Sequence, residues 1–181
     1  EGEQQKLLYA SRMAATLAYL IVEQLDKVSL ATFDEHVREA LPPSNSLSQV
    51  LRLSEILDRT EPVSKTAIGQ PVLELAGRCG RRAVVIILSD FLCDLDDLER
   101  AIQRLRYDRH EVVCFQVMHH HELTFELDGM VRFEGLEDDD RFLTRPADVR
   151  QAYLEALHRF NERLAELCEA NRCEHVLADT S

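Results

Sequence analysis

The chain has 181 residues, of which 45% are hydrophobic and 30% are charged, and its formal net charge is −12. This length fits one domain spanning residues 1–181, and the composition excludes global disorder. The 33 acidic against 21 basic residues argue against a nucleic-acid-binding surface, which needs a basic patch. No apolar run reaches the ~18 residues that a membrane span requires.

Periodicity in the first half predicts helices around one hairpin. Apolar residues at three- and four-residue steps indicate a helix over 6–25, and β-favouring residues over 28–41 indicate a hairpin closed by Pro42 and Pro43. Ser46 with Gln49 is a capping-box pattern that opens a helix through Leu57. After a loop over 59–65, a further helix is expected over 69–80.

The second half predicts parallel strands joined by helices. The apolar run 83–88 reads as a strand buried on both faces, Asp94 begins a helix, and 111–118 is the next strand. Short extended pieces over 125–133 and an acidic loop over 134–140 precede a long helix from Pro146 to Asn171 and a last strand over 175–178. The order predicts an α/β fold: a doubly wound, mostly parallel open sheet with helices on both faces, Rossmann-like in outline.

Several short motifs, in this order and spacing, resemble a von Willebrand factor type A-like domain. More narrowly, they resemble the bacterial proteins catalogued as domain of unknown function fifty-eight, whose genes usually lie beside those of MoxR-type AAA ATPases. The similarity covers essentially the whole chain. The motifs are Lys6-x-x-Tyr9-Ala10, 17–20, 26–33, Leu88-Ser89-Asp90-Phe91-Leu92, 112–117, Glu122-Leu123-x-Phe125 and Ala178-Asp179-Thr180.

The resemblance implies a metal-ion-dependent adhesion site at the carboxyl edge of the sheet. Thr66 would be the ligand from the second loop and Asp90 the ligand from the third, holding Mg²⁺ with hard oxygens. The Asp-x-Ser-x-Ser segment of the first loop has no match, so we expect its strand before residue 1 and a truncated domain. The two remaining oxygens are too few for a dedicated site, so any Mg²⁺ would belong to the full-length protein.

Each of these two residues also has a purely structural interpretation. Asp90 is equally a carboxylate that ends a strand and accepts nearby backbone N–H groups, and Thr66 is equally a turn or cap residue. Without its first strand, the domain would pair its second strand directly with the fourth. Alternatively, it would take a strand from a second copy, which makes a homodimer a further expectation.

Three adjacent histidines and a glutamate follow the strand over 111–118. His119, His121 and Glu122 would lie at the same edge as Asp90, where open α/β sheets place ligands, and imidazoles suit Zn²⁺ or Ni²⁺. Consecutive side chains point in different directions, however, so a solvated loop is the main interpretation. The acidic stretches over 94–99 and 137–140 lack the EF-hand pattern and are interpreted as a helix cap and a solvated loop.

The function that we expect is a non-enzymatic protein-interaction module with an AAA ATPase system as partner. The alternative is a metal-dependent hydrolase acting at the same edge through Asp90 and 119–122, although the Gly-x-Ser-x-Gly elbow is absent. Neither a phosphate-binding nor a dinucleotide-binding glycine motif occurs. The five cysteines lack framework or zinc spacing and no signal peptide opens the chain, so we expect reduced thiols in a cytoplasmic protein.

Overall fold

The computed structural model of the protein describes residues 2–62, 67–79, 82–126, 131–134, 141–144 and 146–180. Helices and strands alternate along most of this length, which makes the protein a mixed α/β structure. In chain order the elements are α1 (Gly2–Glu23), β1 (Val28–Phe33), β2 (Val37–Ser44), α2 (Leu47–Arg59), α3 (Gly69–Ala76), β3 (Val84–Ser89), α4 (Leu95–Tyr107), β4 (Glu111–Met118), α5 (His120–Thr124), β5 (Val131–Glu134), β6 (Arg141–Thr144), α6 (Pro146–Ala170) and β7 (Glu174–Asp179).

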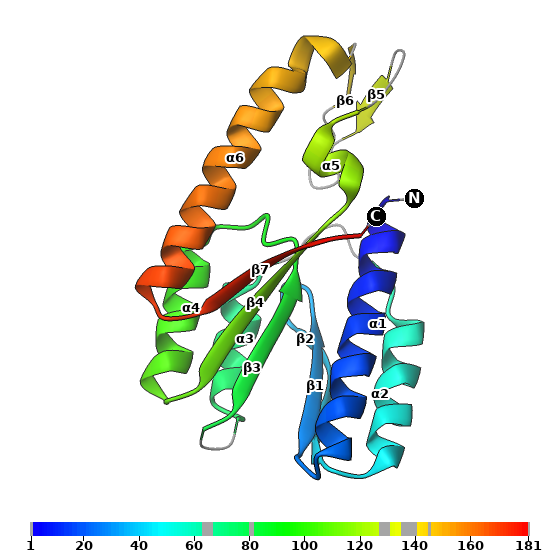
Figure 1. The fold of residues 1–181 in the computed structure, drawn as a ribbon, viewed down its shortest axis with the longest axis vertical. Helices are drawn as coiled ribbons and strands as arrows, with labels where there is room; N and C mark the ends of the chain where they lie inside the picture. Colours follow the sequence, from blue (N-terminus) through cyan, green and yellow to red (C-terminus); the bar gives the residue numbers. More distant parts are fainter. Residues whose placement is uncertain are drawn as a thin grey trace.

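A three-stranded parallel sheet forms the centre of the fold, in the order β3-β4-β7. Residues 84–89 of β3 pair in register with 111–116 of β4, and residues 113–118 of β4 pair with 174–179 of β7. Parallel neighbours need a crossover, and α4 and α6 lie in the two crossovers. α4 and α6 lie on one side of this sheet and α1 on the other (Figure 1).

Two antiparallel hairpins stand outside this sheet. β1 pairs with β2 and β5 pairs with β6, and among the described strands neither hairpin pairs with β3. The hairpin predicted over 28–41 is confirmed, but β2 continues through Pro42 and Pro43 to Ser44. Proline is tolerated there because, in the part of the chain that the structure describes, β2 pairs with β1 alone, so its other edge needs no N–H donors. The described strands therefore give separate sheets rather than one continuous doubly wound sheet.

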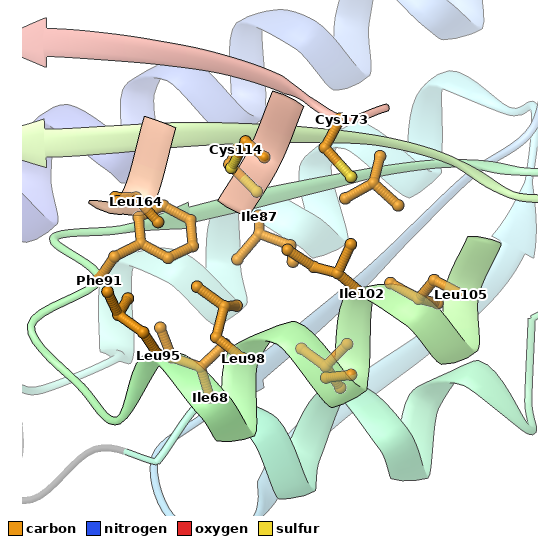
Figure 2. Packing of buried hydrophobic residues seen from close by; sticks show 14 of the residues in the cluster. Ile68, Ile87, Phe91, Leu95, Leu98, Ile102, Leu105, Cys114, Leu164 and Cys173 are labelled. Carbon is orange, nitrogen blue, oxygen red and sulfur yellow. The ribbon is translucent and has the colours of Figure 1, made fainter. Parts of the chain in front are cut away.

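The main hydrophobic core fills the space between the parallel sheet and α3, α4 and α6 (Figure 2). Phe91, Leu98, Ile102 and Leu164 are all fully buried in it. Cys114, Cys168 and Cys173 contribute free thiols to the same core, and Cys79 and Cys93 are also unpaired. Burial of these side chains stabilises the fold by about 25 cal/mol for each Å² of apolar surface removed from water.

The strand over 84–89 is less buried than its apolar sequence predicts. Val84 is 59% exposed, because among the described strands β3 lies at the edge of the three-stranded sheet and pairs with β4 alone. β4 lies between β3 and β7 and alternates between buried and half-buried residues over most of its length. The expectation that the run 83–88 is buried on both faces is therefore wrong for β3.

One of the predicted helix caps forms and the other does not. The side chain of Asp94 accepts hydrogen bonds from the backbone N–H groups of Asp96 at 2.8 Å and Asp97 at 3.3 Å. Ser46 makes no side-chain cap to α2. The expected partner, Gln49, instead donates to the carbonyl oxygen of Pro42 at 2.7 Å, which attaches α2 to the hairpin.

Candidate functional site

Polar side chains gather where the three parallel strands end. Asp90 follows β3, residues 119–122 follow β4, and Asp179 is the last residue of β7. These residues define the carboxyl edge of the sheet, the place at which open α/β sheets bind their ligands. α1 begins at this end of the molecule and runs away from it (Figure 1).

Lys6 joins two of the strand ends through one ammonium group. Its Nζ lies 3.1 Å from Oδ2 of Asp90 and 2.8 Å from Oε1 of Glu122. The Lys6 side chain is only 12% exposed, whereas those of Asp90 and Glu122 are 34% and 31% exposed. Burial alone would lower the pKa of Lys6, but the hydrogen bond to Glu122 and the charges of both carboxylates outweigh it and raise the pKa. Lys6 is therefore a fixed positive charge at neutral pH.

The short helix α5 holds Glu122 in place through a capping box. The backbone N–H of His119 donates to Oε2 of Glu122 at 2.8 Å, and Nδ1 of His119 accepts from the backbone N–H of His121 at 3.2 Å. Since Nδ1 accepts, the neutral ring carries its proton on Nε2, which donates to Oε1 of Gln5 at 2.6 Å. The first turn of α1 thus contacts this helix through both Gln5 and Lys6.

A second ion pair links α5 to the end of β7. Nδ1 of His120 lies 2.9 Å from Oδ2 of Asp179. The hydrogen bond to Asp179 raises the pKa of His120, and the carboxylate charge acts in the same direction. The segments after β4 and at the end of β7 are therefore joined by a contact that strengthens when the imidazole is protonated.

A tight turn after β3 presents Asp90. Oδ1 of Asp90 accepts the backbone N–H of Leu92 at 3.2 Å, and Oγ of Ser89 accepts the backbone N–H of Phe91 at 3.1 Å. Phe91 adopts φ = 60°, a left-handed conformation that is unfavourable for residues with a side chain, and its ring is fully buried. Burial of the ring offsets this backbone cost. Its acceptance of a backbone N–H is the structural role expected of a strand-end carboxylate.

α6 contributes an aromatic group beside the ion pairs. The rings of Tyr153 and Phe125 lie 4.5 Å apart between centroids, a distance typical of aromatic contact. Burial raises the pKa of the Tyr153 hydroxyl, the charge of Glu122 raises it further, and the charge of Lys6 lowers it. Tyr153 is thus close enough to the Lys6–Glu122 pair for their charges to influence its proton.

A buried amide connects this edge to the body of the domain. Gln116 of β4 is fully buried; its Nε2 donates to Oδ1 of Asn161 on α6 at 2.9 Å and to the carbonyl oxygen of Asp90 at 3.4 Å. Its Oε1 lies 3.1 Å from Nε2 of His175 on β7, which donates to it. One side chain therefore links α6, β7 and the turn that carries Asp90.

The structure does not bring the predicted metal ligands together as one set. Asp90 lies at the expected edge, whereas Thr66 lies outside the described residues. His119 and Glu122 meet in the capping box, and the rings of His119 and His121 lie 5.1 Å apart between centroids. Within the described part of the chain, no group of three or more His, Cys, Asp or Glu residues is arranged to hold a metal ion.

Four residues that organise the edge come from elements outside the strand ends and were not predicted as site residues. Gln5 and Lys6 come from α1, Tyr153 from α6 and Gln116 from the interior of β4. A signal for Lys6 was present, because it lies four residues before Ala10 and so continues the apolar stripe of the helix. Gln116, a polar residue within a buried apolar strand, carried a similar signal.

The fold and the edge define a mixed α/β domain with a polar centre at the ends of its parallel strands. A family model described as "Protein of unknown function DUF58" matches residues 1–163, and the chain belongs to this family. Comparisons with curated proteins and with solved structures gave no match. None of the described helices combines the length and apolar character needed to cross a membrane.

Proposed function

We propose that the chain is a non-enzymatic protein-interaction module whose partner contacts the carboxyl edge of the parallel sheet. The supporting observation is that charged groups from α1, β3, α5 and β7 converge there while remaining partly open to solvent. The side chains of Asp90, Glu122 and Asp179 are 34%, 31% and 35% exposed. Leu92, whose backbone N–H bonds to Asp90, is 49% exposed, and an exposed apolar side chain next to a charged group suits a protein interface.

The partner that we propose is a MoxR-type AAA ATPase, and the proposed architecture is von Willebrand factor type A-like. Both extend the resemblance of the sequence motifs. The parallel order β3-β4-β7 with helices on both sides supports this architecture. The position of Asp90 after β3 supports the same edge as the contact surface.

We further propose that a full open sheet includes a strand between β1 and β3. Among the described strands, β1 pairs with β2 alone and β3 with β4 alone, while α1 contacts both sheets. The exposure of Val84 supports an incomplete edge. A second copy that supplied this strand would make a homodimer, and light scattering would then measure twice the mass of the monomer. A monomer over the whole measured concentration range would refute the exchange of strands between copies.

Binding to a purified MoxR-type ATPase, measured by biolayer interferometry, tests the proposed surface. We expect Asp90→Ala to weaken binding at least about tenfold, since a desolvated charged contact contributes more than about 1.4 kcal/mol. Asp26→Ala is the matched control, because it removes an exposed carboxylate beyond the opposite end of α1. Equal affinities of the wild type and Asp90→Ala would refute the proposed surface.

Turnover assays test the non-enzymatic part of the proposal. Generic phosphoester and ester substrates cover the hydrolase alternative, in which Asp90 and His119 would act at the same edge. In the structure the His119 ring is hydrogen-bonded on both nitrogens, to Gln5 and to the backbone of His121. Hydrolysis by the wild type that disappears in Asp90→Ala would refute the non-enzymatic proposal and support the hydrolase alternative.

A further inference from the structure

The carboxylates at this edge do not fit a divalent ion while Lys6 is in place. Oδ2 of Asp90 and Oε1 of Glu122 both accept from the Lys6 ammonium, at 3.1 and 2.8 Å. The remaining oxygens, Oδ1 of Asp90 and Oε2 of Glu122, accept backbone N–H groups at 3.2 and 2.8 Å. Each carboxylate oxygen therefore already has an N–H donor.

We propose that Lys6 is the resident cation of the carboxyl edge. Its ammonium occupies the position between Asp90 and Glu122 that a divalent ion would take, and it makes the edge independent of metal. The consequence for partner binding rests on the proposed function, whereas the exclusion of metal ions does not.

Geometry and charge both support this role. Mg²⁺ binds carboxylate oxygens at about 2.0–2.1 Å, so an ion on Oδ2 of Asp90 would lie within the space of the ammonium. The Lys6 side chain is only 12% exposed and comes from a mostly apolar helix. An ammonium group displaced by Mg²⁺ would therefore stay next to the ion and repel it. The three groups carry a net charge of −1 with Lys6 present (+1 − 2) and −2 without it. Removing Lys6 therefore strengthens the attraction for a dication and frees the two oxygens that the ammonium occupies.

Thermal unfolding at increasing Mg²⁺ concentration, in buffer of constant ionic strength, tests the proposal. We expect no saturable shift for the wild type up to about 10 mM Mg²⁺. In Lys6→Met, an affinity near 1 mM would raise the midpoint by about 3 °C or more at that concentration. The double variant Lys6→Met/Asp90→Asn is the control, and it should lose the shift.

Two results would overturn the proposal. One is saturable Mg²⁺ binding to the wild type that Asp90→Asn abolishes. This test needs no Lys6 variant, so it remains valid even if the Lys6 variants do not fold. The other is a folded Lys6→Met or Lys6→Gln protein whose midpoint of thermal unfolding does not change with Mg²⁺ concentration. Because no partner is present, these outcomes are separate from failure of the interaction proposal. Partner binding that withstands EDTA would extend the result to function, and binding abolished by EDTA would contradict that extension.

Discussion

Replacing Gln116 with leucine tests whether the buried amide holds the candidate site to the domain. Leucine is slightly larger than glutamine, so the change removes hydrogen bonds without opening a cavity. Asn161 loses a donor at 2.9 Å and His175 loses an acceptor at 3.1 Å. The carbonyl oxygen of Asp90 loses a weaker contact at 3.4 Å.

The expected cost follows from the exposure of the two partners. A fully buried group that loses its hydrogen-bond partner costs about 1–3 kcal/mol. Asn161 and His175 are only partly buried, so water reaches them and the lower end of this range applies to each. The free energy of unfolding of Gln116→Leu should therefore fall by about 2 kcal/mol. In a double-mutant cycle, the coupling between Gln116→Leu and Asn161→Ala should be about 1 kcal/mol.

Urea unfolding followed by circular dichroism at neutral pH measures both quantities. The volume-conserving Leu98→Met serves as the control, since it changes a fully buried apolar residue of the core without touching the amide network. A Gln116→Leu protein within about 0.5 kcal/mol of the wild type would refute the reasoning, as would additive effects of the two changes.

Four further predictions concern packing, capping and pH. Gly69→Ala should destabilise the protein by about 1–3 kcal/mol in urea unfolding, because the added Cβ would lie 2.9 Å from the backbone oxygen of Asp97. Asp94→Ala should cost about 1 kcal/mol in the same assay by removing the cap of α4. Burial lowers the pKa of His175, so its neutral form stabilises the fold; this contribution is present above 6.5 and is lost as pH falls through the lowered folded value. His175→Gln should therefore flatten the acid side of the stability profile. The raised pKa of His120 has the opposite sign: its contribution is present below 6.5 and lost as pH rises through the folded value, so His120→Gln should flatten the neutral side.

Local patterns were sufficient to predict most of the elements. Strict apolar periodicity located the long helix over 146–170, and the apolar runs located β3 and β4. The cap at Asp94 was predictable because an N-cap depends on residues within one turn of itself. These features need no knowledge of distant contacts, and the structure agrees with them.

The two capping boxes show where local reasoning fails. Ser46 and Gln49 have the right spacing, but the hairpin provides a carbonyl acceptor at Pro42 that takes the Gln49 amide. His119 and Glu122 have the same spacing, and there the reciprocal bonds form. The difference lies in what the rest of the chain brings near each helix, which a three-residue pattern does not contain.

The carboxyl edge was predictable only in part, because some of its residues depend on strand order alone and others on the packing of distant elements. Asp90 and Glu122 follow strands, so parallel pairing alone brings them to one edge. The contribution of Lys6 depends on how α1 packs across the sheet, and the arrangement of β1 and β2 as a separate hairpin sheet depends on pairing choices that hydrophobic patterning leaves open. Thr66 lies outside the described residues, so its predicted role stays a prediction.

The bridge made by Lys6 also bears on the order in which the chain folds. Its two partners lie 84 and 116 residues further along the sequence, so α1 cannot complete these contacts until residue 122 has been synthesised, although its contacts with α2 can form earlier. Contacts of such long separation form late, because the entropy of closing the loop is lost before the contact stabilises anything. We therefore predict that, in pulse-labelling hydrogen exchange during refolding, the amides of β3 and β4 become protected before those in the first turns of α1. Simultaneous protection would refute this order. If the order holds, the side of α1 that packs on β3 and β4 stays uncovered in an emerging chain until those strands have left the ribosome.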